Sequence, residues 1–115
     1  MLKLIALFLA LTLTAVHSTI LLGGYSDRPD LIQDAEVQGL VKYASQYLAS
    51  TQNLVLNHIK IRHVQTQVVA GMNYKIDFTG QSMDNYRNDY MDCQTVIYVR
   101  FDGTKRITDI QCQPM

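Results

Sequence analysis

Apolar side chains recur every three or four residues from Asp30 to about Ser50. The positions that share one face of this segment are Val37, Leu40, Val41, Ala44 and Leu48. This spacing predicts one long amphipathic helix. Pro29 discourages an earlier start, and Asp30 followed by Gln33 resembles a capping box. Gly39 lies within the segment, where a missing side chain would let a sheet approach the helix closely.

A different pattern follows the helix, with apolar and polar positions alternating one by one. Residues 59–62 alternate in this way, and residues 72–78 give the clearest period-two pattern of the chain. Both segments are predicted strands. Between them, the run QTQVVAG is strand-like until it reaches Gly71, where the backbone is free to adopt a positive φ. The two strands therefore form a hairpin whose tip lies at residues 67–71.

The last part of the chain predicts a second hairpin. Cys93–Phe101 is rich in Val, Ile and Tyr, and Lys105–Cys112 is the returning strand after an Asp102-Gly103 turn. By contrast, Thr79–Asp92 is polar and rich in turn-forming residues, which predicts a long loop with little structure. A short additional strand is expected near Gly24–Ser26.

These elements favour an α+β fold, with one long α-helix packed on a four- to five-stranded antiparallel β-sheet. One helix on one sheet is the economical way to bury both apolar faces. In a meander of this kind, the hairpin tips at 67–71 and near 101–103 can lie at the same end of the sheet.

The N-terminal segment adds a targeting signal to this picture. Lys3 is followed by an almost wholly apolar run over 4–16, and a small residue, Ser18, stands at the expected cleavage position. This pattern predicts a secretory signal peptide over residues 1–18 and one small secreted, extracellular domain over 19–115. The run is shorter than the roughly 20 residues of a membrane span, so we expect no membrane association.

Charge and metal-ligand patterns exclude several function classes. The chain carries ten basic and ten acidic residues with no basic stripe, which argues against nucleic-acid binding. His58 and His63 are five residues apart and would face opposite sides of a strand, so they make a poor metal pair. Asp84, Asp89 and Asp92 lack the spacing of a calcium loop. We expect no metal and no cofactor.

Cys93 and Cys112 are the only cysteines. An even pair in an exported chain favours one disulfide, which would close the open end of the second hairpin. The competing interpretation is a catalytic thiol. The oxidising export route and the strand-like surroundings of both cysteines disfavour it.

Three separated motifs resemble those of the cystatins, the inhibitors of papain-like cysteine proteases. Gly23, preceded by Ile20-Leu21-Leu22, is similar to the N-terminal trunk and glycine of that family. Gln67-Val68-Val69-Ala70-Gly71 matches the Gln-x-Val-x-Gly motif of its first loop. Cys93 and Cys112 resemble the second of the two disulfides in secreted cystatins. Together the motifs span essentially the whole predicted domain.

The resemblance implies a cystatin fold and a non-enzymatic function. In that family, the trunk and two hairpin loops enter the protease cleft, which gives reversible, competitive inhibition without covalent chemistry. The implied protease-binding residues are Leu21, Leu22, Gly23, Gln67, Val68, Val69, Ala70, Gly71, Arg100 and Phe101. The implied partners are papain and the cathepsins. The protein would act as a monomer, with a domain-swapped dimer as the alternative.

The chain departs from the family at three places. Arg100-Phe101 stands where the second loop usually carries Pro-Trp, so an aromatic ring is present but the rigid proline is not. No cysteine of the first family disulfide occurs in Thr79–Asp92. Where some cystatins carry a legumain-binding Asn after the helix, this chain reads Ser50-Thr51-Gln52, so that activity is not expected.

Two other functions stay open at this stage. The chain could be a cystatin-fold binding or structural protein that has lost inhibition, which the missing Pro-Trp permits. It could also be a small secreted enzyme, although no pair of nucleophile and base is recognisable in the sequence. Phe101 has two interpretations as well, either as an anchor that contacts the protease or as a residue packed in the core.

Overall fold

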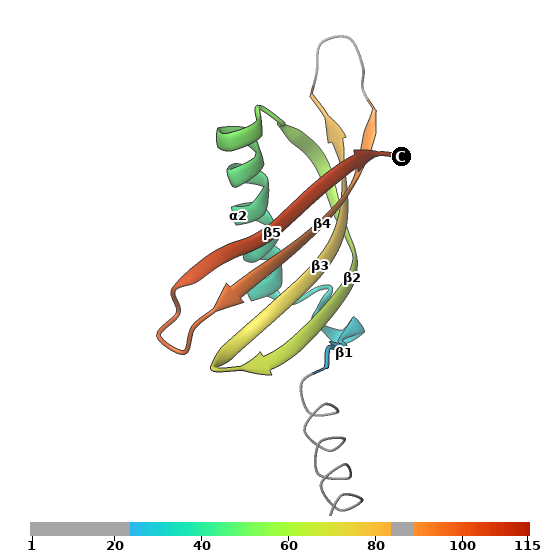
Figure 1. The fold of residues 1–115 in the computed structure, drawn as a ribbon. Coiled ribbons are helices and arrows are strands. Elements are labelled where there is room, and N and C mark those ends of the chain that lie inside the picture. The colour runs from blue at the N-terminus through green and yellow to red at the C-terminus, as the bar shows by residue number, and fades with distance from the viewer. Residues whose placement is uncertain (1–23, 84–88) are drawn as a thin grey trace, which may run out of the picture.

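The computed structural model of the protein describes residues 24–83 and 89–115. The predicted signal peptide and the predicted trunk residues Leu21, Leu22 and Gly23 lie outside this part of the chain. The described elements are β1 (Ser26–Asp27), η1 (Pro29–Leu31), α2 (Ala35–Gln52), β2 (Leu56–Val69), β3 (Gly71–Ser82), β4 (Tyr90–Val99) and β5 (Lys105–Pro114). The strands form one five-stranded antiparallel sheet in sequential order, and α2 crosses one of its faces (Figure 1).

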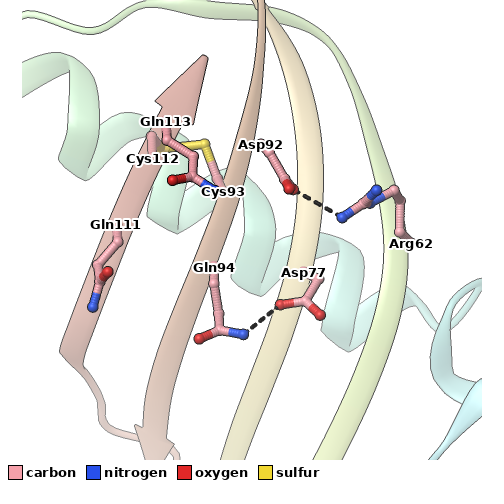
Figure 2. A pocket seen from close by; sticks show the side chains of 8 residues that line it. All are labelled: Arg62, Asp77, Asp92, Cys93, Gln94, Gln111, Cys112 and Gln113. Atoms are coloured by element: carbon pink, nitrogen blue, oxygen red, sulfur yellow. Dashed lines mark hydrogen bonds and ion pairs between the residues drawn. A yellow bond between two sulfur atoms is a disulfide. The ribbon is translucent and has the colours of Figure 1, made fainter. Parts of the chain in front are cut away.

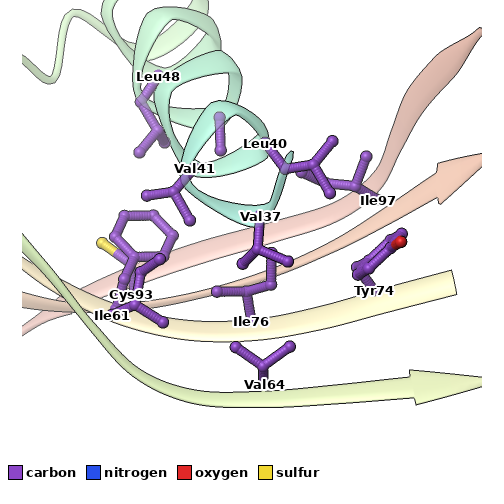
Figure 3. Packing of buried hydrophobic residues seen from close by; sticks show 12 residues of the cluster. Val37, Leu40, Val41, Leu48, Ile61, Val64, Tyr74, Ile76, Cys93 and Ile97 are labelled. Atoms are coloured by element: carbon purple, nitrogen blue, oxygen red, sulfur yellow. The ribbon is translucent and has the colours of Figure 1, made fainter. Parts of the chain in front are cut away.

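The predicted fold class is therefore confirmed, and so is the face by which the helix packs. All five predicted apolar positions of α2 are buried against β2, β3 and β4 (Figure 3). The core that they form with the sheet consists of Val37, Leu40, Val41, Ala44, Leu48, Ile61, Val64, Tyr74, Ile76, Phe78, Cys93 and Ile97. Gly39 is exposed, and a β-carbon built on it would meet nothing within 4 Å. The expectation of a close approach at Gly39 is therefore wrong.

The helix begins later than predicted. Ala35 is its first residue, and the carboxylate of Asp34 accepts a hydrogen bond from the Val37 amide at 3.2 Å. This is the N-cap interaction that the sequence pattern had assigned to Asp30. Asp30 instead lies in the short 3-10 helix η1, where its carboxylate pairs with Arg28 at 2.9 Å. The capping box at Asp30 is therefore wrong, because Arg28 already engages that carboxylate.

The segment Thr79–Asp92 is also more regular than expected. β3 continues to Ser82 and β4 begins at Tyr90, so Met83 and Asp89 are the only described residues of this segment outside the strands. The strand pattern is hidden at Gly80, which has no side chain of its own and packs against Leu56 of β2. The prediction of a long, unstructured loop is wrong for the described residues of this segment.

Strand register brings two turns to one end of the sheet. In β3, Met72 pairs with Val68 of β2 on one side and with Val99 of β4 on the other. The β2–β3 and β4–β5 turns consequently lie next to each other, at the end where β2 and β4 terminate (Figure 1). At the other end of the second hairpin, Cys93 pairs with Cys112, and the predicted disulfide joins them.

Candidate functional site

The tip of the first hairpin is as short as a hairpin allows. Val69 pairs with Gly71, which leaves Ala70 as the only residue between the strands. Val68 and Val69 keep 71% and 38% of their surfaces exposed, although both are apolar. The predicted residues Gln67, Val68, Val69, Ala70 and Gly71 thus meet at one narrow projection, which presents apolar surface to solvent, most of it from Val68.

Gly71 has a specific role in forming this projection. Its φ is +128°, a conformation that side chains rarely permit. A β-carbon at Gly71 would also lie 2.5 Å from the carbonyl oxygen of Val99 and 3.0 Å from the Tyr98 ring. The first loop therefore packs directly on the end of β4, and only glycine allows this approach.

Tyr98 is a residue of this site that the sequence analysis missed. It belongs to β4, but its hydroxyl donates a hydrogen bond to the carbonyl of Ala70 at the tip of the neighbouring hairpin. Between β3 and β2, the side-chain amide of Asn73 donates to the side-chain oxygen of Gln67 at 3.1 Å. The only signal in the sequence was the position of Tyr98 two residues before Arg100, which does not reveal a contact across strands.

The second loop is a closed turn. The Gly103 amide donates to the Arg100 carbonyl at 3.0 Å, which makes Phe101 and Asp102 the two central residues of the turn. The Arg100 amide donates to the Thr104 carbonyl at 2.9 Å. Phe101 is therefore in the turn itself rather than before it, and 86% of its surface is exposed. The core-packing interpretation of Phe101 is wrong.

Asp102 stabilises this turn through its side chain. The carboxylate accepts hydrogen bonds from the amide and the hydroxyl of Thr104, at 3.0 and 2.8 Å. These bonds favour the ionised form and lower the pKa of Asp102. A lowered pKa means that the bonds are present above the usual aspartate range and are lost as the pH falls through the pKa of the folded state. The shift therefore concerns the side-chain bonds of Asp102, while the backbone bonds of the turn do not titrate.

The N-terminal chain enters the sheet at the same end. Ser26 pairs with Thr66 in antiparallel register, so Tyr25 and Gly24 precede it in the direction of Val69 and the first loop. Asp27 anchors this entry, since its carboxylate accepts a bond from Gln65 at 2.9 Å and lies 3.0 Å from His63 Nε2. The same two contacts lower the pKa of Asp27, that with Gln65 most.

A second candidate site lies on the sheet face away from α2 (Figure 2). It is a depression of about 290 Å³, and its charged side chains already have partners within its lining. Arg62 pairs with Asp92 at 2.9 Å, and Gln94 donates to Asp77 at 2.8 Å. Across residues 24–83 and 89–115, no three His, Cys, Asp or Glu side chains gather as metal ligands would, and no helix is long and apolar enough to cross a membrane.

The geometry therefore centres on two adjacent turns and the nearby N-terminal entry, and comparison with known proteins agrees. A family model for the cystatin domain matches residues 23–105. The chain belongs to the cystatin family. Cystatins are protease inhibitors and not enzymes, which confirms the non-enzymatic expectation. The disulfide between Cys93 and Cys112 is consistent with membership of this family.

Relatives and solved structures support the same assignment. A salivary cystatin-L of Ixodes scapularis is 29% identical over an alignment that covers 79% of this chain and 81% of that protein. The fold resembles that of mialostatin, a gut cystatin from the hard tick Ixodes ricinus, with a TM-score of 0.65 at 21% identity, over 80% of this chain and 99% of that one. A salivary cystatin from the soft tick Ornithodoros moubata gives a TM-score of 0.61 at 21% identity, over 79% and 97% of the two chains.

The contrast between Gly71 and Gly39 yields a prediction about stability. We expect Gly71→Ala to lower the free energy of unfolding by more than about 1 kcal/mol, because the new β-carbon meets a backbone oxygen and the φ is unfavourable. Gly39→Ala is the matched control. It lies in open space on a helix and should raise stability by about 0.5–1 kcal/mol. Urea unfolding of both variants measures the two effects, and equal shifts would contradict the packing described at Gly71.

Proposed function

We propose that this protein is a secreted, reversible and competitive inhibitor of papain-like cysteine proteases. The observation that carries the proposal is the apolar surface at one end of the sheet. Val68 and Phe101 are 71% and 86% exposed at the tips of two adjacent loops. Exposed apolar side chains on rigid, neighbouring projections are typical of a protein-binding surface.

The architecture of the two loops fits entry into a narrow cleft. The first tip consists of a single small residue, Ala70, which follows Val68 and Val69. It presents apolar surface and backbone but no bulky charged group. The second tip carries Phe101 beside the cationic Arg100, and its aromatic ring would pack against the cleft wall in place of the tryptophan of other cystatins. Because both turns are closed by internal hydrogen bonds, docking orders few groups.

The N-terminal trunk would supply the third contact. Leu21, Leu22 and Gly23 precede β1, which enters the sheet beside the first loop. We infer that Leu22 fills the apolar pocket that reads a substrate side chain and that Gly23 turns the chain away from the catalytic thiolate. Extracellular action fits the predicted signal peptide over residues 1–18 and the disulfide.

Inhibition of papain tests the proposal directly. The protein spanning residues 19–115 should inhibit papain and cathepsins at or below micromolar concentration, with competitive kinetics and full recovery of activity on dilution. Trypsin is the control and should be unaffected, because a cystatin surface offers no substrate-like loop for a serine protease. A folded, disulfide-bonded protein that inhibits none of the papain-like enzymes would instead support a non-inhibitory binding function.

The exposure of Phe101 makes its role testable in one variant. Phe101→Ala should weaken inhibition by about 1–3 kcal/mol, or roughly five- to 150-fold, through loss of aromatic contact area. The melting temperature should hardly change, because the ring contacts little of the fold. Tyr90→Ala is a control, since it removes a ring that is 49% exposed at the opposite end of β4. Unchanged inhibition by Phe101→Ala would remove the second loop from the binding surface.

Trimming the N-terminus tests the trunk separately. A protein that begins at Gly23 should bind papain about ten- to a hundredfold more weakly than one that begins at Thr19, because burial of one Leu side chain contributes about 1.5–3 kcal/mol. A protein that begins at Leu21 keeps both leucines and should bind nearly as well as the longer form. Thermal unfolding should be the same for all three. Equal affinities would show that the trunk makes no contact.

A further inference from the structure

We propose that Tyr98 is a positioning residue, which holds the first loop in the shape that binds the protease. The inference rests on the proposed function, since it assigns a role to Tyr98 in protease binding. Tyr98 itself lies on β4, outside both loops, and is not among the residues that the family motifs indicate. Two independent contacts carry the assignment.

The first contact is the hydrogen bond from the Tyr98 hydroxyl to the Ala70 carbonyl. Ala70 is the one residue between β2 and β3, so its carbonyl lies beyond the last ladder pair, Val69 with Gly71. Among the residues that the structure describes, no backbone amide donates a hydrogen bond to this carbonyl. The Tyr98 side chain reaches it from β4, the strand beyond β3, and the orientation of the tip peptide therefore depends on a residue 28 positions away in sequence.

The second contact lies between the Tyr98 ring and Gly71. The ring passes close to Gly71, and a β-carbon there would be 3.0 Å from the nearest ring carbon. The ring thus occupies space that any other residue at position 71 would fill. Hydroxyl and ring together hold both Ala70 and Gly71, which are the consecutive residues that turn the chain.

Tyr98 also connects the two loops. Arg100, which closes the second turn through its amide and carbonyl, follows Tyr98 by two residues. A fixed Tyr98 therefore keeps the tip at Ala70 in register with the turn that carries Phe101. Arg100-Phe101 stands in this chain where other cystatins carry Pro-Trp, so no proline restrains the second loop. The contact between Tyr98 and Ala70 restrains the two loops in its place.

The kinetics of binding separate positioning from direct contact. If only a fraction of molecules has the competent loop shape, the apparent affinity falls by that fraction. A positioning residue therefore changes the association rate and leaves the dissociation rate of the formed complex almost unchanged. A residue that touches the protease would mainly change the dissociation rate.

Tyr98→Phe is the variant that tests the proposal, because it removes the hydroxyl and retains the ring. We expect the association rate with papain to fall about three- to tenfold, from the loss of one hydrogen bond, with an unchanged dissociation rate. Amide hydrogen exchange at residues 70–72 should accelerate by a similar factor. Tyr90→Phe is the matched control. It changes the same residue type on the same strand, and the Tyr90 hydroxyl makes no hydrogen bond to the described residues, so neither rate should change.

Each outcome bears on the inference. Unchanged association and unchanged exchange in Tyr98→Phe would overturn it, and a faster dissociation alone would make Tyr98 a direct contact instead. A lower melting temperature with unchanged association would reduce its role to stability. If the unmodified protein does not bind papain, the proposed function fails, and the exchange measurement alone then decides whether Tyr98 holds the loop.

Discussion

The backbone of Gly71 lies so close to the end of β4 that no side chain fits between them. The site of a β-carbon is 2.5 Å from the Val99 carbonyl oxygen, closer than real β-carbons approach backbone atoms. This contact lies next to the last pair of the β3–β4 ladder, Met72 with Val99, which joins the two hairpins. At the same place, the Tyr98 hydroxyl donates a hydrogen bond to the Ala70 carbonyl of the first tip. The close packing of the first loop on the end of β4 therefore depends on one glycine with a positive φ.

Burial on one side of each element explains why much of the fold was predictable. The α2 positions at spacings of three and four must all face the sheet, and residues 72–78 must alternate because one face of β3 packs on the helix. Both patterns appear directly in the chain, and both were confirmed. The placement of the two turns at one end followed from the order of the strands. Successive turns of an antiparallel meander lie at opposite ends, so the β2–β3 and β4–β5 turns share one end and the β3–β4 turn lies at the other.

Contacts between distant residues explain what was not predictable. Asp30 and Asp34 are equally good N-cap residues by type, and the choice depends on the pairing of Asp30 with Arg28. Gly80 interrupts the alternating pattern of β3 because it has no side chain, and the apolar side chain beside it belongs to Leu56 of β2. Tyr98 read as an ordinary strand residue, since nothing nearby in sequence indicates that its hydroxyl reaches Ala70. In each case a partner from another part of the chain decides the outcome.

The exposure of Phe101 has a consequence for the evolution of such a protein. A side chain that contacts little of its own fold can be replaced without loss of stability, whereas Gly71 can hardly be replaced at all. Stability therefore leaves position 101 free to vary, whereas it keeps the glycine at position 71. Under the proposed function, a new target preference could arise by substitution at position 101 within the same inherited scaffold.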